Sequence, residues 1–241
     1  MAFLENMIKK IMDEGLVFSK EKLNESVFKI EIQSKAVKTL DFVPGSFIRL
    51  GVGFGKEVTS KKDMVRSYSI WSIDKERNTF SLAIALHSKG IGAKWAETCS
   101  IGDTVYFKTK RGKFTLDDSA DSYLMIGDLS ALSHLYTINR YLSAEKQVES
   151  IIYNADTAEL YSDVDDKKPF DFYSIDQNNS SEVISKIKLI IPQLKGVKMA
   201  YIGGDSRVCV AVNNFLRKEL KWNATQIKTK PFWNPDKKGL E

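Results

Sequence analysis

The sequence predicts a β plus α/β protein: an N-terminal antiparallel β-barrel followed by a C-terminal doubly wound parallel-sheet domain. The first half of the chain consists of short alternating segments between glycine, proline and charged turns, which is typical of a small antiparallel barrel. The second half alternates apolar strand-like segments with segments of helical spacing. A polar linker, residues 117–121, separates the halves, so we expect domains at 1–118 and 119–241.

Composition and charge narrow the class of protein. Hydrophobic residues make up 43% of the 241 positions and charged residues 28%, which is ordinary globular composition. No apolar run approaches the ~20 residues that cross a bilayer. Residues 1–15 have the spacing of a short amphipathic helix and lack the features of a signal peptide, so we expect a cytoplasmic protein and a monomer. The net charge of +5 is too mild for nucleic-acid binding and favours an anionic substrate.

The chain's thiols and imidazoles are too few for a metal centre. Cys99 and Cys209 are far apart and form no CxxC pattern, so neither a disulfide framework nor an iron–sulfur cluster is expected from them. We expect both to be buried structural thiols. His87 and His134 likewise fall short of a metal site. Redox chemistry in this chain would therefore require an organic cofactor.

The expected elements follow one another along the chain. After the N-terminal helix, strands are expected at 16–33, 47–50, 65–72, 79–86 and 103–108. In the second half, strands are expected at 123–126, 148–153 and 199–202, and helices at 131–142, 180–191 and 208–220. Glycines close two of the later strands, at Gly127 and at Gly203 and Gly204. This pattern is typical of a parallel sheet that binds a ligand at its carboxyl edge.

The segment Arg66-Ser67-Tyr68-Ser69 lies where a barrel strand is expected. Arg66 offers a fixed cation and a planar fork of donors suited to a pyrophosphate. Tyr68, on the same face two residues later, would lie flat against a flavin or a ribose. Ser69 faces the other way, and its hydroxyl would reach the flavin N5 only if the strand end twists. The alternative is an ordinary amphipathic strand with an exposed arginine.

A glycine-rich turn, residues 89–93, follows about twenty positions later and leads into a short helix at 94–97. Backbone amides at such a helix start can bind phosphate oxygens without a charged side chain. The alternative is a plain turn. Trp95 belongs to this helix, and an aromatic side chain on a helix more often packs into the core than it contacts a cofactor.

Several motifs together resemble a known family. PGSFI at 44–48, RSYS at 66–69, HSKGIGAKWA at 87–96 and RGKF at 111–114 occur in the order and approximate spacing of the ferredoxin–NADP reductase superfamily. Within it, the chain most resembles the siderophore-interacting, or ferric-siderophore reductase, family. HSKGIGAKWA is similar to that family's HGxGPAxxWA, GDLSAL at 127–132 resembles GDETALP, and KPFW at 230–233 resembles GYW. The resemblance covers nearly the whole chain.

The resemblance implies FAD on the barrel and NAD(P)H on the second domain. The cofactor-binding residues that it implies, taken with the patterns above, are Arg66, Ser67, Tyr68, Ser69, His87, Lys89, Gly90, Gly92, Ala93, Trp95, Gly127, Asp128, Ser130, Ala131 and Trp233. Three positions depart from the family pattern. Trp71 stands where members often carry arginine, Ile91 replaces the usual proline, and Ser133 stands where proline often follows. The second-domain match is the looser one.

In the second domain, Gly127 and Asp128 at a strand end, with Ser130 as an N-cap, would suit a nicotinamide dinucleotide. A plain strand–helix turn is the alternative. The acidic segment 154–159 follows the next strand, where the adenosine ribose would lie, and disfavours a 2′-phosphate, so the sequence leans toward NADH. Trp233, between Pro231 and Pro235, would cover the flavin face.

These residues lead to a functional hypothesis. A nicotinamide would pass hydride to the flavin, and the reduced flavin would pass single electrons to Fe(III) in an anionic chelate, such as a ferric siderophore. Fe(II) binds hard oxygen donors less tightly, so reduction releases the metal. No catalytic acid or base is required. Basic side chains would receive the chelate, unless they are only a solvated surface: Lys56, Lys110, Arg111 and Lys230.

Two rival functions remain open at this point. One is a general flavin reductase that serves a ferredoxin, a flavodoxin or an oxygenase, with a ferredoxin also conceivable as the electron donor. The other is a non-catalytic chelate-binding protein that has kept the fold.

Overall fold

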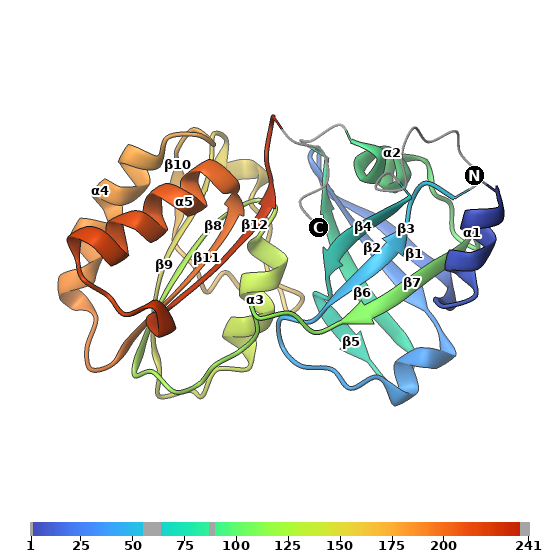
Figure 1. Ribbon diagram of the computed structural model, residues 1–241, viewed down its shortest axis with the longest axis horizontal. Coiled ribbons are helices and arrows are strands. Elements are labelled where there is room, and N and C mark those ends of the chain that lie inside the picture. Colours follow the sequence, from blue (N-terminus) through green and yellow to red (C-terminus); the bar gives the residue numbers. More distant parts are fainter. Residues whose placement is uncertain (1, 55–63, 87–89, 237–241) are drawn as a thin grey trace. The chain divides into compact units, whose positions relative to one another are not determined.

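The computed structural model describes residues 2–54, 64–86 and 90–236 (Figure 1). The chain divides into two compact units, Met1–Gly112 and Lys113–Leu240. Three residues with an expected site role, Lys56, His87 and Lys89, lie outside the described residues. Within the described ranges, no helix is long and apolar enough to cross a lipid bilayer.

The first unit is an antiparallel sheet curled into a barrel. In the part of the chain that the structure describes, it has seven strands in the order β4-β3-β7-β1-β2-β6-β5. Its elements are α1 (Ala2–Lys9), β1 (Asp13–Asn24), β2 (Val27–Gln33), η1 (Lys35–Thr39), β3 (Phe47–Gly51), β4 (Val65–Ser69), β5 (Ser72–Asp74), β6 (Thr79–Ala85), α2 (Ile91–Thr98) and β7 (Thr104–Lys110). The antiparallel barrel predicted from the sequence is confirmed.

Two consecutive amides close the barrel. The edge strands β4 and β5 follow each other in the chain, joined by Ile70 and Trp71. The Ile70 amide donates to the Ser46 carbonyl beside β3 at 3.1 Å, and the Trp71 amide donates to the Ser81 carbonyl of β6 at 2.9 Å. The prediction of one strand over 65–72 was therefore wrong. At Ile70 and Trp71 the chain leaves its pairing with the β3 side and begins its pairing with β6, so this short segment connects the two edges of the sheet.

The alternating segment 16–33 also forms two strands instead of one. β1 and β2 pair as a hairpin, with Asn24 opposite Val27. The Asn24 side chain accepts a hydrogen bond from the Ser26 amide at 2.9 Å, which is the local bond by which asparagine favours a turn. The alternation of apolar and polar residues continues on both sides of this short turn. The sequence pattern alone therefore cannot locate the turn.

The core of the first unit is built from the inward residues of these strands. Ile30, Ile48 and Leu50 are fully buried, and the rings of Phe80 and Phe107 meet edge to face with centroids 5.0 Å apart. The expectation that the two cysteines are buried free thiols is confirmed.

The second unit is a parallel sheet with helices on both faces. Among the described residues it has five strands in the order β10-β9-β8-β11-β12. Its elements are β8 (Ser122–Asp128), α3 (Leu132–Arg140), β9 (Gln147–Asn154), η3 (Thr157–Glu159), β10 (Phe172–Ser174), α4 (Ser180–Ile190), η4 (Ile191–Gln193), β11 (Lys198–Asp205), α5 (Ser206–Asn214), η5 (Phe215–Glu219), η6 (Ala224–Gln226) and β12 (Ile227–Trp233). α4 and α5 pack together on one face (Figure 1).

Two strands of this sheet, β10 and β12, were not predicted from the sequence. β10 has only three residues, and β12 contains Pro231 and alternating lysines instead of an apolar run. Both lie at sheet edges, where proline is tolerated because one side of the strand needs no partner. The strand order reverses between β8 and β11, and the carboxyl end of such a switch point is where open parallel sheets bind ligands.

Phe114 anchors the start of the second unit. Its ring lies 4.9 Å from the His134 ring and 5.5 Å from the Tyr201 ring, centroid to centroid. His134 Nε2 donates to the Phe114 carbonyl at 2.7 Å, since a carbonyl can only accept. The Tyr201 hydroxyl accepts from the Asp117 amide at 2.8 Å and donates to the Thr115 carbonyl at 3.0 Å. The polar linker is therefore bonded into the second unit, and the division falls before it.

A pH prediction follows from the burial of His134. Burial lowers the pKa of His134 to about 3, and the charge of Lys230 adds to the shift. The unfolded chain, with a pKa near 6.5, then takes up the proton first, so the free energy of unfolding falls as the pH drops from 6.5 toward 3. The slope is about 1.4 kcal/mol per pH unit. Urea unfolding at pH 7 and pH 5 should show a loss about 2 kcal/mol smaller in His134→Gln than in the wild type. Equal losses in both proteins would contradict a neutral buried imidazole.

Candidate functional site

The side chains of Arg66 and Tyr68 lie on the inner face of the barrel at its β4 edge. In the β3–β4 register Leu50 pairs with Arg66 and Ile48 pairs with Tyr68, and residues directly opposite each other share a face. Tyr68 packs against the barrel core, while Arg66 is partly buried and donates through Nη1 to the Val65 carbonyl at 2.9 Å. The expectation that Arg66 and Tyr68 face the same way is confirmed.

The first turn of α2 meets these two side chains. A Cβ atom at Gly92 would collide with the Tyr68 hydroxyl and would lie 3.5 Å from Arg66 Cγ, so only glycine allows this close approach. Gly90 is the N-cap residue of α2, and no side chain among the described residues caps the helix there. The first turn of α2, whose N–H groups have no acceptor within the helix, therefore lies against the Arg66 side chain.

This arrangement fits the group that the sequence motifs imply. A pyrophosphate needs positive charge and N–H donors, which Arg66 and the start of α2 supply together. A planar ring system needs an aromatic neighbour, and Tyr68 lies at the same place. Separated segments of the chain thus converge on one side of the barrel with the chemistry of a flavin dinucleotide site.

The structure also locates the other expected residues of this site. Trp95 is only 8% exposed and packs into the barrel core, and its contact with the cofactor stays a prediction. Trp71 is 2% exposed, so the position where family members often carry arginine holds a core side chain here. Ser67 pairs with Arg49 on the outer face, and Ser69 is buried opposite Phe47. Gly90 and Ala93 flank Gly92 in the first turn of α2.

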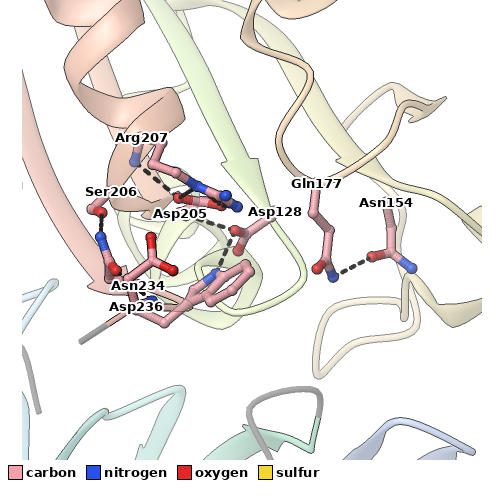
Figure 2. A network of polar contacts seen from close by, with 9 residues as sticks. Asp128, Asn154, Gln177, Asp205, Ser206, Arg207, Asn234 and Asp236 are labelled. Carbon is pink, nitrogen blue, oxygen red and sulfur yellow. Dashed lines mark hydrogen bonds and ion pairs between the residues drawn. The ribbon is translucent and has the colours of Figure 1, made fainter. Parts of the chain in front are cut away.

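At the carboxyl edge of the parallel sheet, the Asp128 carboxylate joins three strands (Figure 2). Oδ1 accepts from the Ser130 amide at 2.9 Å and from the Ser130 hydroxyl at 2.5 Å. Oδ2 accepts from the Asp205 amide of β11 at 2.7 Å and from the Trp233 indole of β12 at 2.8 Å. Asp128 is 1% exposed, so these donors replace the water that a buried carboxylate loses.

Ser130 does not cap α3. The N-cap residue is Ala131, which makes no side-chain cap bond, and the Ser130 hydroxyl is turned to Asp128 instead. Ala131 is fully buried. A Cβ atom added at Gly127 would lie 3.1 Å from the Ala131 Cβ, and one added at Gly203 would lie 2.9 Å from it. The two glycines let α3 start close to the sheet. A cofactor contact by Gly127 or Ala131 stays a prediction and would have to come through the backbone.

Arg207 is a candidate that the sequence analysis missed. It lies in the first turn of α5, where Asp205 accepts from its Nη2 at 2.6 Å and from its Nε at 3.2 Å. The pairing with Asp205 raises the pKa of Arg207. The Asp205 carboxylate orients the guanidinium, and because the side chain is 42% exposed, an anion in solution can reach it. The signal available in the sequence was an arginine two residues after a glycine-closed strand.

Asn154 fixes the acidic segment after β9. Its amide donates to the Asp156 carbonyl at 2.9 Å and to the Glu159 carboxylate at 2.7 Å, and it lies 3.4 Å from the Gln177 side chain (Figure 2). Asn154 is 2% exposed, so the carboxylate of Glu159 is held at the end of β9. Preference for NADH over NADPH stays a prediction.

The outer face of the barrel carries a group of cations, here called the basic face: Arg49, Lys108, Lys110 and Arg111. All four are exposed, and Arg49 lies directly opposite Lys108 in the β3–β7 ladder. Like charges in that relation repel, and the Asp13 carboxylate, 3.9 Å from Lys108 Nζ, offsets part of this repulsion. Sequence reasoning found Lys110 and Arg111 and missed Arg49. Lys230 belongs to β12 of the second unit, where burial lowers its pKa.

Comparison with known proteins agrees with both units. Residues 13–114 match the family model of the siderophore-interacting FAD-binding domain, and residues 120–236 match that of the siderophore-interacting protein. The chain belongs to the siderophore-interacting protein family. Its first unit is accordingly the FAD-binding domain, and the family predicted from the motifs is confirmed.

Solved structures of the family share the fold at low identity. SipS from Aeromonas hydrophila is 16% identical, with a TM-score of 0.76 over 94% of this chain and 93% of that chain. The siderophore-interacting protein from Acinetobacter baumannii is 14% identical, with a TM-score of 0.78 over 93% of this chain and 91% of that one.

Among curated proteins, the ferric vibriobactin reductase ViuB of Vibrio cholerae is 22% identical over 181 residues, which is 73% of this chain. The match covers 66% of ViuB, so the chain spans about two thirds of the length of this relative. Phthalate dioxygenase reductase from Burkholderia cepacia is 26% identical over 132 residues, covering 54% of this chain and 38% of that protein.

The role of Arg66 can be tested by cofactor retention. Arg66→Ala removes the guanidinium beside the start of α2, and loss of a charged hydrogen bond costs about 1.5–3 kcal/mol. We expect the Kd for FAD to rise about tenfold to 150-fold, measured by flavin fluorescence on reconstitution of stripped protein. Arg77→Ala, in the β5–β6 turn of the same barrel, is the matched control and should retain FAD. An unchanged Kd in Arg66→Ala would remove Arg66 from the cofactor site.

Proposed function

We propose that the protein is an FAD-dependent oxidoreductase that uses NAD(P)H to reduce Fe(III) held in a siderophore. The observation that carries the proposal is the convergence of Arg66, Tyr68 and the start of α2 in a barrel of a siderophore-interacting FAD-binding family. ViuB, a relative named a ferric vibriobactin reductase, supports the same reaction. The protein would act as a monomer in the cytoplasm, and its buried free thiols suit a reducing compartment.

The overall reaction balances in electrons. One NAD(P)H releases a proton and two electrons as it becomes NAD(P)+, and two Fe(III) chelates each accept one electron to give Fe(II). FAD, when bound, supplies the exchange between two-electron and one-electron transfer. Fe(II) then leaves because hard oxygen donors hold it less tightly than Fe(III).

The chain's own residues would bind and orient. Arg66 and the start of α2 would hold the FAD pyrophosphate, and Tyr68 would lie against its planar part. Arg207, with its guanidinium fixed by Asp205, would anchor the phosphates of the nicotinamide dinucleotide at the carboxyl edge of β11. The basic face, together with Lys56 and Lys230, would attract an anionic chelate.

A second candidate is a reductase for a protein partner. It is supported by the similarity to phthalate dioxygenase reductase, whose name indicates that it serves a dioxygenase. A ferredoxin would then serve as acceptor or, in place of the nicotinamide, as donor. An acceptor panel separates the two candidates, and a colourless purified protein would favour the non-catalytic relative over both.

The reaction itself predicts a stoichiometry. Under anaerobic conditions with a ferrous trap, the protein should form two Fe(II) per NAD(P)H oxidised, because a hydride carries two electrons and each iron accepts one. Absorbance of the trapped Fe(II) and of the nicotinamide measures both. Free FAD at the same concentration is the control. If neither NADH nor NADPH reduces the bound flavin, the donor is wrong. If the flavin is reduced but a ferric chelate reoxidises it no faster than free flavin, the iron assignment is lost.

Charge reversal tests the basic face. The double variant Arg49→Glu/Lys110→Glu should raise the KM for an anionic ferric chelate severalfold and flatten its salt dependence, because exposed charges act over about 10 Å at 0.1 M salt. Lys35→Glu/Lys38→Glu, on the exposed side of η1, changes the net charge equally and should leave the KM unaltered. Equal KM changes in both variants would indicate general electrostatics and remove the basic face from the substrate site.

A further inference from the structure

The hydrogen bond between Asp128 and Trp233 joins strands that are not neighbours. Asp128 ends β8 and Trp233 ends β12, and β11 lies between them in the sheet. Adjacent strands are about 4.8 Å apart, so the two residues are separated by about twice that spacing. Even so, Trp233 Nε1 lies 2.8 Å from Asp128 Oδ2.

Gly204 makes this crossing possible. It has φ +114, and a Cβ atom there would lie 2.5 Å from Asp128 Cγ, inside the carboxylate. Only glycine adopts this backbone conformation readily and leaves the space above β11 open. The Asp128 side chain passes over that position and reaches the indole of the edge strand (Figure 2).

The bond fixes the indole at its N–H while the side chain stays partly exposed. Trp233 is partly exposed, whereas its N–H points to a carboxylate that is 1% exposed. A hydrogen bond to an ionised acceptor is stronger and more directional than a neutral one. Trp233 therefore presents a planar apolar surface in a set orientation at the carboxyl edge of the sheet, beside the switch point between β8 and β11.

We propose that Asp128 is a positioning residue that holds Trp233 as the stacking surface for an aromatic ring of the nicotinamide dinucleotide. The inference rests on the proposed function, since it names the contact made by the electron donor. Both the nicotinamide and the adenine are planar heterocycles suited to an indole. Asp128 itself is 1% exposed, and its oxygens accept from groups of the protein. Its effect passes through Trp233.

Binding and fluorescence of the FAD-loaded protein test the proposal. Titration calorimetry with NAD+, nicotinamide mononucleotide and ADP-ribose gives Kd values, and tryptophan emission reports quenching. We expect NAD+ to quench the emission of the wild type, and the fragment that also quenches it identifies the stacked ring. Trp233→Phe should abolish most of this quenching and weaken NAD+ about threefold to tenfold. Trp222→Phe, a partly buried tryptophan of the same unit, should change neither.

Asp128→Ala and the double variant Asp128→Ala/Trp233→Phe separate positioning from simple packing. Alanine removes both carboxylate oxygens, so the Trp233 indole loses its acceptor and NAD+ should weaken as in Trp233→Phe. If Asp128 acts through Trp233, the double variant loses no more affinity than either single variant. Additive losses would overturn the positioning role. Because Trp233→Phe leaves Asp128 in place, it tests the stacking surface even if Asp128→Ala fails to fold.

The outcomes distinguish this inference from the proposed function. If the wild type binds NAD+ and Trp233→Phe binds it equally well with its quenching intact, the inference falls and the proposed function stands. If the wild type binds no nicotinamide nucleotide and neither NADH nor NADPH reduces its flavin, the proposed donor falls, and this inference falls with it.

Discussion

The buried carboxylate of Asp128 sets the architecture of the second unit. A charge that is 1% exposed must be surrounded by donors, and these come from the turn after β8, from the end of β11 and from the end of β12. Strand ends that are brought together in this way form the carboxyl edge where parallel sheets bind ligands. The same constraint requires Gly204, because any side chain there would occupy the space of the carboxylate.

In the first unit, too, a glycine leaves room for a side chain of the candidate site. At Gly92 the missing side chain lets Tyr68 and Arg66 approach the start of α2. In both units a glycine marks the place where a functional side chain needs room, and in both the side chain comes from a segment far along the chain. The second unit gathers carboxylates, Arg207 and an aromatic ring, whereas the first gathers the Arg66 side chain and the first turn of α2. The two units thus suit different parts of a redox pathway.

The fold is shared with solved relatives at low sequence identity. At 14–16% identity the fold of siderophore-interacting proteins is retained over almost the whole chain. The departures from the family pattern are local: Trp71 fills the barrel core where family members often carry arginine, and Ser133 is buried in α3. Arg49 and Arg207, by contrast, supply positive charge that no motif of the resemblance indicated.

The sequence by itself determined the barrel, the parallel sheet and the RSYS segment, because strand alternation, helical spacing and strand-end glycines are local patterns that burial imposes on neighbouring residues. It could not locate the turn at Ser26, the break at Ile70 or the edge strand β12, since period two continues through a short turn and an edge strand needs no apolar run. Nor could it reveal that Asp128 reaches Trp233 across β11, or that Gly92 lies against Tyr68. Those contacts join residues distant in the chain, and only the packed tertiary structure, through the room left at single glycines, decides them.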